Sequence, residues 1–111
     1  MQRLEERVKN EIMICDGGMG TQLHALGLQP GECPEQWCLS KPDRVKSVHQ
    51  AYRDVGSQIV ETNTFGGNRF KLAHYGLDGE VAAINRAGAA LLARGMSPLP
   101  SRRPCPSPWS L

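Results

Sequence analysis

Two apolar runs, each followed at once by a polar motif that contains glycine, constrain the fold of this 111-residue chain most strongly. The first run, residues 11–15, leads into Asp16-Gly17-Gly18-Met19-Gly20-Thr21, and the second, at Ile59-Val60, leads into Glu61-Thr62-Asn63-Thr64-Phe65-Gly66-Gly67-Asn68. An apolar run of strand length without alternation is typical of a strand buried on both faces of a parallel sheet. Parallel α/β folds build their binding sites where such strands end. The pattern therefore predicts an α/β fold with polar sites at two strand ends.

Helical patterns occupy much of the remaining sequence. A short polar helix is expected over residues 1–10, and a helical turn over 21–26 that Gly27 ends. Ser40 is a plausible N-cap of a longer helix that Gly56 ends, with Pro42 in its first turn. Its expected apolar face is Val45, Val48, Tyr52 and Val55. Two further helices are expected over residues 68–74 and 80–94, and irregular chain over 28–39.

The character of the sequence changes after residue 94. Residues 95–111 contain five of the eight prolines, and proline is unfavourable in helices and central strands. We therefore expect one partial domain over residues 1–94 and a disordered or extended Pro-rich tail over residues 95–111.

Composition excludes several classes of function. The net charge of +2 is too small to indicate a nucleic-acid partner. No apolar run approaches the roughly 20 residues that span a bilayer, and the charged N-terminus has no signal-peptide core. We expect a cytoplasmic protein whose four cysteines, Cys15, Cys33, Cys38 and Cys105, are reduced.

The first motif suits an amino acid better than a nucleotide. A dinucleotide site requires G-x-G-x-x-G, but Leu23 stands at the third glycine position and Asp16 would repel a pyrophosphate. Asp16 can instead accept from a substrate ammonium, while the N–H groups of Gly17 and Gly18 can donate to its carboxylate. The alternative is that Asp16 caps the next helical turn.

The second motif adds Asn63 and Thr64, whose short polar side chains can fix a small ligand. The direction of Glu61 stays open, and Phe65 is more often a packing residue. A structural turn with capped polar groups is the alternative interpretation of this motif.

Together these motifs resemble the N-terminal part of the homocysteine S-methyltransferase domain. The resemblance lies in residues 16–21 and in the pattern Pro42-Asp43-x-Val45-x-x-x-His49-x-x-Tyr52-x-x-x-Gly56. It continues through residues 61–66 and Lys71-Leu72, so that it covers roughly residues 11–94. It is strongest for the homocysteine-binding module of cobalamin-dependent methionine synthases.

The resemblance implies a fold, a substrate and cofactors. The implied fold is the first two to three βα units of a TIM (β/α)8 barrel, here incomplete. The implied activity is methyl transfer to the homocysteine thiol in methionine biosynthesis, with zinc on three cysteine thiolates and cobalamin as a possible methyl donor. The resemblance assigns substrate binding to Asp16, Gly17, Gly18, Asn63 and Thr64.

The sequence also departs from the family. The zinc cysteines of the family lie on late strands in a pattern that ends in Cys-Cys, which this sequence lacks. We therefore expect an N-terminal fragment that holds no metal and no catalytic residue, and that self-associates or aggregates because two βα units leave sheet edges unpaired. The alternatives are an inactive truncated remnant and a small amino-acid-binding or interaction module.

Overall fold

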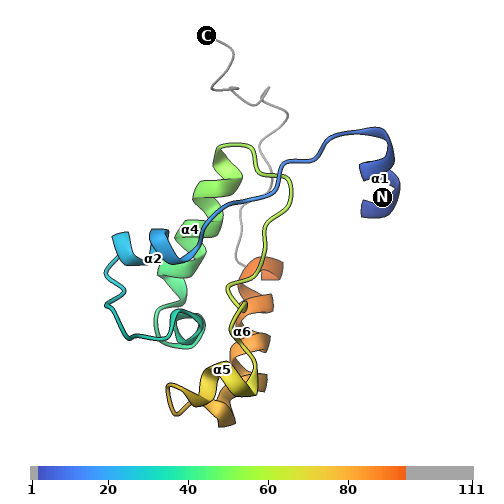
Figure 1. The fold of residues 1–111 in the computed structure, drawn as a ribbon. Helices are drawn as coiled ribbons and strands as arrows, with labels where there is room; N and C mark the ends of the chain where they lie inside the picture. Colours follow the sequence, from blue (N-terminus) through green and yellow to red (C-terminus); the bar gives the residue numbers. More distant parts are fainter. Residues whose placement is uncertain (1–2, 95–111) are drawn as a thin grey trace.

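The computed structural model describes residues 3–94, and this part of the chain is built from helices (Figure 1). The predicted tail, residues 95–111, lies outside the described residues. In chain order the elements are α1 (Leu4–Asn10), α2 (Gly20–Ala25), the 3-10 helix η1 (Pro34–Gln36), α3 (Trp37–Ser40), α4 (Pro42–Asp54), α5 (Arg69–Ala73), the 3-10 helix η2 (Asp78–Glu80) and α6 (Val81–Arg94).

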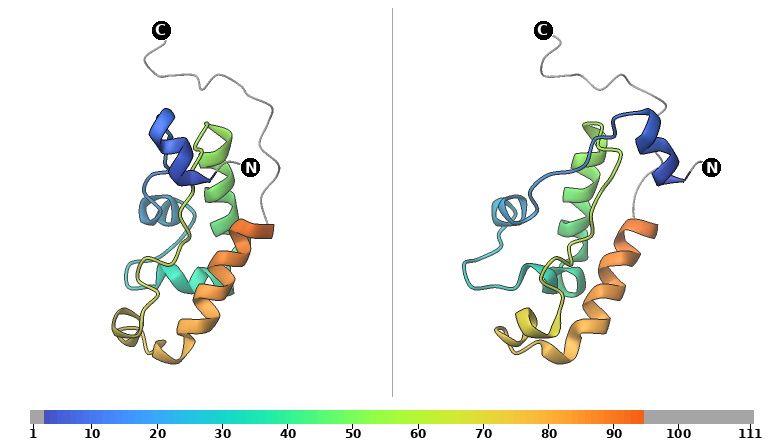
Figure 2. Two further views of the ribbon diagram at one scale, coloured as in Figure 1. Left: turned by 90° about the vertical axis from the view of Figure 1, so that its right-hand side faces the viewer. Right: turned by 45° about the vertical axis from the view of Figure 1, so that its right-hand side comes forward.

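The helices pack around two small apolar clusters. The larger cluster joins α2, α3 and α4 and consists of Leu23, Leu28, Trp37, Cys38, Val45 and Val48. Ala87 and Leu91 of α6 pack against it. The smaller cluster joins Cys33 and Leu72 to Ile84 of α6. The helix α6 therefore contacts both clusters and connects them (Figure 2).

Local sequence signals account for several helix ends. Gly27 and Gly56 follow α2 and α4 at φ +108° and +107°, a conformation that glycine adopts without strain. The side chain of Asn68 caps α5 by accepting from the Lys71 N–H at 2.9 Å.

Three of the expectations about these helices are wrong. The N-cap of α4 is Lys41, while the Ser40 hydroxyl donates back to the Gln36 carbonyl. Val55 is 64% exposed instead of facing the core, because it lies beyond the last turn of α4. The predicted irregular stretch contains η1 and α3, which bury Trp37.

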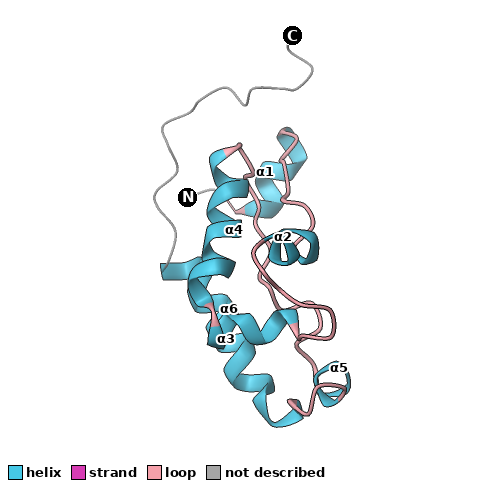
Figure 3. Ribbon diagram, turned by 90° about the vertical axis from the view of Figure 1, so that its left-hand side faces the viewer, coloured by secondary structure: helices cyan, strands magenta, loops and turns pink. Residues whose placement is uncertain are grey.

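The predicted α/β fold, with two to three βα units of a TIM barrel, is wrong for the described chain. Figure 3 draws helices and loops over residues 3–94 and no strand. The two apolar runs pass each other as extended segments and form a single isolated parallel bridge, Cys15 with Ile59. Around that bridge, Asp16 N–H donates to the Ile59 carbonyl at 2.9 Å, and Ile59 N–H donates to the Ile14 carbonyl at 3.0 Å.

The lack of neighbours explains why these runs form no strands. A parallel sheet is stable when both of its faces are covered and further strands continue the ladder. Within residues 3–94 no third segment pairs with either run, and helices cover the pair incompletely. Ile12 is 94% exposed and Ile14 is 44% exposed, so the first run is not the buried strand that its composition predicts.

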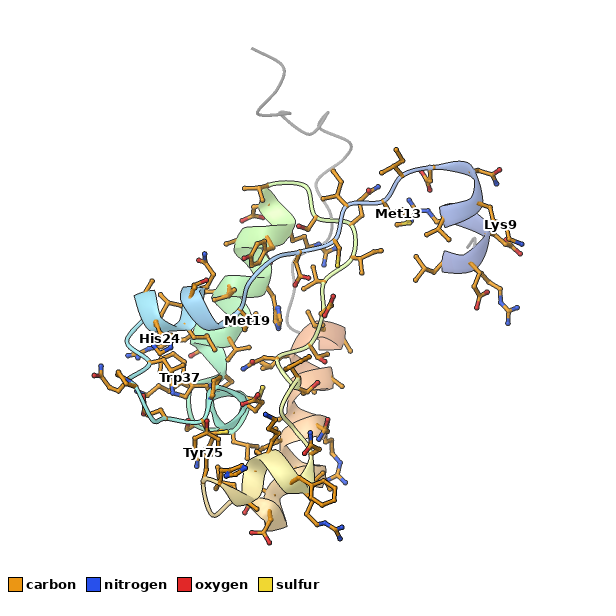
Figure 4. The ribbon with its side chains drawn as sticks, in the orientation of Figure 1. Lys9, Met13, Met19, His24, Trp37 and Tyr75 are labelled. Carbon is orange, nitrogen blue, oxygen red and sulfur yellow. The ribbon has the colours of Figure 1, made fainter. Side chains whose placement is uncertain are left out.

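The N-terminal helix stands apart from the rest of the molecule. Figures 1 and 2 show α1 at the end of an extended link, and Figure 4 places Met13 on this link and Met19 at the start of α2. None of the described residues of α1 is buried. No helix in the described part of the chain is long and apolar enough to cross a membrane.

Candidate functional site

A cavity of about 200 Å³ lies where the two polar motifs meet. Its lining consists of Asp16, Gly17, Met19, Glu61, Thr62, Asn63 and Phe65. Both motifs contribute to it because the Cys15–Ile59 bridge brings their first residues side by side. Of the five predicted site residues, Asp16, Gly17 and Asn63 line the cavity, whereas Gly18 and Thr64 do not.

The Asp16 carboxylate bridges the two motifs. Its Oδ2 accepts from the backbone N–H of Glu61 at 3.1 Å, and its Oδ1 accepts from the Cys15 thiol at 3.6 Å. Met19, not Asp16, is the N-cap of α2, and no side chain caps that helix. Asp16 therefore does not cap α2, and the capping alternative is wrong.

The Cys15 thiol lies between two carboxylates. Its single proton can be donated to Glu61 Oε1 at 3.5 Å or to Asp16 Oδ1 at 3.6 Å. The Cys15 sulfur and one oxygen of each carboxylate lie within 4.8 Å of one another. Desolvation and these two hydrogen bonds raise the pKa of Cys15, which favours the neutral thiol. Cys15 is exposed, although it ends an apolar run that the sequence predicts to be buried.

Asn63 and Thr64 use their side chains mainly for internal contacts. The amide of Asn63 donates to the Pro34 carbonyl at 2.8 Å, and only 6% of the residue is exposed. The Thr64 hydroxyl lies 2.6 Å from that of Thr62. A Cβ on Gly88 would lie 2.5 Å from the Thr64 methyl, which shows how closely this side chain packs on α6.

Four lining residues were not among the predicted site residues: Met19, Glu61, Thr62 and Phe65. Glu61 and Thr62 follow the second apolar run directly, and this position could have marked them as candidate site residues. Phe65 is 97% exposed, so the expectation that it is a packing residue is wrong. Met19 belongs to the first polar motif, and it enters the lining at the N-cap position of α2.

Side chains from other elements hold the second loop in place. Glu35 Oε1 accepts from the Gly66 N–H at 2.9 Å, and the Asn85 amide of α6 donates to the Gly67 carbonyl at 2.7 Å. These contacts come from residues far apart in the sequence, so the position of the loop depends on the packing of α6 and the segment before α3.

A buried histidine lies one helical turn before Tyr52 on α4. His49 is fully buried, and neither of its ring nitrogens has a hydrogen-bond partner among the described residues. Burial lowers its pKa, while the charge of Asp16 acts in the opposite direction. The imidazole is therefore preferentially neutral in the folded chain.

The charged side chains in the cavity lining are both acidic. Among the residues that the structure describes, the lining contains two carboxylates, Asp16 and Glu61, and no lysine or arginine. Within residues 3–94, the Gly17 and Gly18 N–H groups donate to no other residue. Such a cavity favours a cationic group beside the carboxylates, and free backbone N–H groups suit an anionic group of the same small molecule.

Comparison with known proteins supplies the family. The model of the homocysteine S-methyltransferase family matches residues 13–99. The methionine synthase of Mycobacterium tuberculosis (strain ATCC 25618 / H37Rv) is 32% identical over 93 residues, covering 78% of this chain and 8% of that protein. The methionine synthase of Mycobacterium leprae (strain TN) is 31% identical over 97 residues, covering 82% of this chain and 8% of that protein.

The chain belongs to the homocysteine S-methyltransferase family, because the family model matches most of its length. This confirms the resemblance that the two motifs carry in the sequence. The chain spans only 8% of the length of each of the two methionine synthases, so it corresponds to a small part of such an enzyme.

Proposed function

We propose that this chain provides the part of a homocysteine S-methyltransferase that binds the amino-acid end of homocysteine. The observation that carries the proposal is the placement of the Asp16 carboxylate and the Gly17 backbone on one small cavity, whose described lining residues include no basic side chain. Asp16 would accept from the substrate ammonium, and the N–H groups of Gly17 and Gly18 would donate to its carboxylate.

The second motif would complete the binding site from the other side. Asn63 lines the cavity, and its contacts with Pro34 fix the backbone of the loop. Thr64 would act through its hydrogen bond with Thr62, which does line the cavity.

The thiols of the described chain do not fit the three-thiolate zinc site that the family implies. Cys15 donates to carboxylates, whereas Cys33 donates to Glu35 and Cys38 to the Asn63 carbonyl. Burial raises the pKa of Cys38 to about 11, which opposes formation of a thiolate. We therefore assign no methyl-transfer step to these residues; the zinc and the cobalamin methyl donor that the resemblance implies would act in a longer enzyme of the family.

Substitution of Asp16 by Asn tests the proposal. The change keeps the shape of the side chain and its ability to accept from Glu61, but it removes the charge. Charge-assisted hydrogen bonds contribute roughly 1.5–3 kcal/mol. We expect Asp16→Asn to weaken homocysteine binding about tenfold to a hundredfold in isothermal titration calorimetry under reducing conditions.

Two controls make this test specific. Asp43→Asn removes a charge at an exposed position in the first turn of α4, outside the cavity lining, and should bind homocysteine like the parent chain. The analogue 4-sulfanylbutanoate lacks the ammonium, so it should bind the parent and Asp16→Asn equally weakly. A parent chain that binds homocysteine no better than this analogue would overturn the proposal.

A further inference from the structure

The first loop of the cavity is attached to the helix behind it by one side chain. Tyr52 of α4 donates from its hydroxyl to the Gly18 carbonyl at 2.6 Å. Among the described residues, this is the only hydrogen bond that the backbone of Gly17 or Gly18 makes. Tyr52 itself packs against the larger apolar cluster, so the anchor is connected to the core.

The loop also approaches the same hydroxyl very closely. A Cβ on Gly17 would lie 3.1 Å from Tyr52 Oη and 3.4 Å from its ring carbon Cε1. The absence of a side chain at Gly17 therefore lets the backbone lie directly on the tyrosine. The close contact of Gly17 with Tyr52 and the hydrogen bond from Tyr52 to Gly18 together determine which side of the loop faces α4.

The hydrogen bond also determines the orientation of a peptide group. No cis peptide bond is present among the described residues. In a trans peptide the carbonyl and the following N–H point in opposite directions. With the Gly18 carbonyl directed at Tyr52, the Met19 N–H is directed away from α4, and Met19 lines the cavity. The Met19 N–H has no acceptor among residues 3–94.

We infer that Tyr52 is a positioning residue, which holds residues 17–19 so that their backbone N–H groups are available to the ligand carboxylate. This inference rests on the proposed function for the identity of the ligand. It adds a residue outside the cavity lining, and a third backbone donor, Met19, to the proposed binding site. The hydroxyl is the group that matters, since the ring by itself supplies only packing.

Tyr52→Phe tests the inference because it removes the hydroxyl and keeps the ring. Loss of one hydrogen bond predicts about threefold to tenfold weaker homocysteine binding by calorimetry. In the ligand-free chain, the Gly18 carbonyl carbon and Met19 amide resonances should shift in NMR spectra, which loss of packing elsewhere would not reproduce. Tyr75→Phe is the matched control, since Tyr75 is 44% exposed and lies outside the cavity lining. It should change neither homocysteine binding nor the Gly18 and Met19 resonances.

A second variant approaches the same contact from the loop. Gly17→Ala pushes the backbone away from the Tyr52 hydroxyl without altering α4, and it should shift the Gly18 carbonyl resonance in the same direction as Tyr52→Phe. Unchanged Gly18 and Met19 resonances in both variants would overturn the inference. If the parent chain binds no homocysteine, the proposed function fails, while these resonances still decide whether Tyr52 positions the loop.

Discussion

At the scale of single residues, burial and charge set the behaviour of the groups around the cavity. Asp16 is a polar group with hydrogen-bond partners, and His49 is a buried polar group without them in the described part of the chain. The Asp16 carboxylate accepts hydrogen bonds from two donors and lines the cavity, whereas the His49 imidazole is fully buried and has no hydrogen-bond partner within residues 3–94. A buried polar group of this kind loses hydration on folding and gains no hydrogen bond in return.

The buried imidazole predicts that the chain loses stability in mild acid. Because burial lowers the pKa of His49 below its ordinary value of 6.5, the unfolded chain takes up a proton more readily than the folded chain. The free energy of unfolding should therefore fall as the pH is lowered from about 7.5 to about 5.5, by at most about 1.4 kcal/mol per pH unit from this residue.

Urea denaturation at a series of pH values measures this dependence. His49→Met should flatten the curve over that range, because the variant has no proton to gain at this position. His74→Gln removes an exposed histidine and should leave the slope as it is in the parent. An equal slope in His49→Met and the parent would contradict the prediction.

At the scale of elements, the cavity loops are positioned by described helices that themselves contribute no lining residue. Tyr52 of α4 anchors the first loop, while Glu35 of η1 and Asn85 of α6 anchor the second. Gly88 of α6 lies against the methyl of Thr64, where a Cβ would find no room. The geometry of the site therefore depends on how closely α6 approaches the second loop.

Gly88→Ala tests that close approach. Alanine is the better helix former by about 1 kcal/mol, but its methyl would lie 2.5 Å from Thr64 Cγ2. Overpacking typically costs roughly 1–3 kcal/mol, so we expect net destabilisation in thermal or urea unfolding. Thr64→Ser removes the methyl and keeps the hydroxyl, so the double variant should recover most of the lost stability. A single variant more stable than the parent would show that the contact is loose.

At the scale of the whole molecule, a small core coexists with exposed apolar side chains. Ile12, Phe65 and Phe70 are 94%, 97% and 75% exposed. The single parallel bridge uses one side of the first extended run, and the N–H groups of Met13 and Cys15 have no acceptor among the described residues. Unpaired edges with apolar side chains favour pairing with another chain.

We predict that the chain self-associates as its concentration rises, which size-exclusion chromatography with light scattering measures. Ile12→Lys places a charge on the exposed edge and should shift the distribution towards the monomer. Gln22→Lys adds the same charge at an exposed position of α2, outside the extended edge, and should have a smaller effect. A parent chain that stays monomeric at high concentration would contradict this prediction.

The sequence by itself determined the family and most helices, because these depend on local signals. Asn68 and Gly56 end or begin helices through their own side chain or backbone freedom, and the two motifs identify the family without reference to the fold. The assignment of Asp16, Gly17, Gly18, Asn63 and Thr64 to substrate binding stays a prediction. Only the tertiary structure decided the rest: the apolar runs form no strands, since a strand depends on neighbours, and Tyr52 meets Gly18 across 34 residues of sequence.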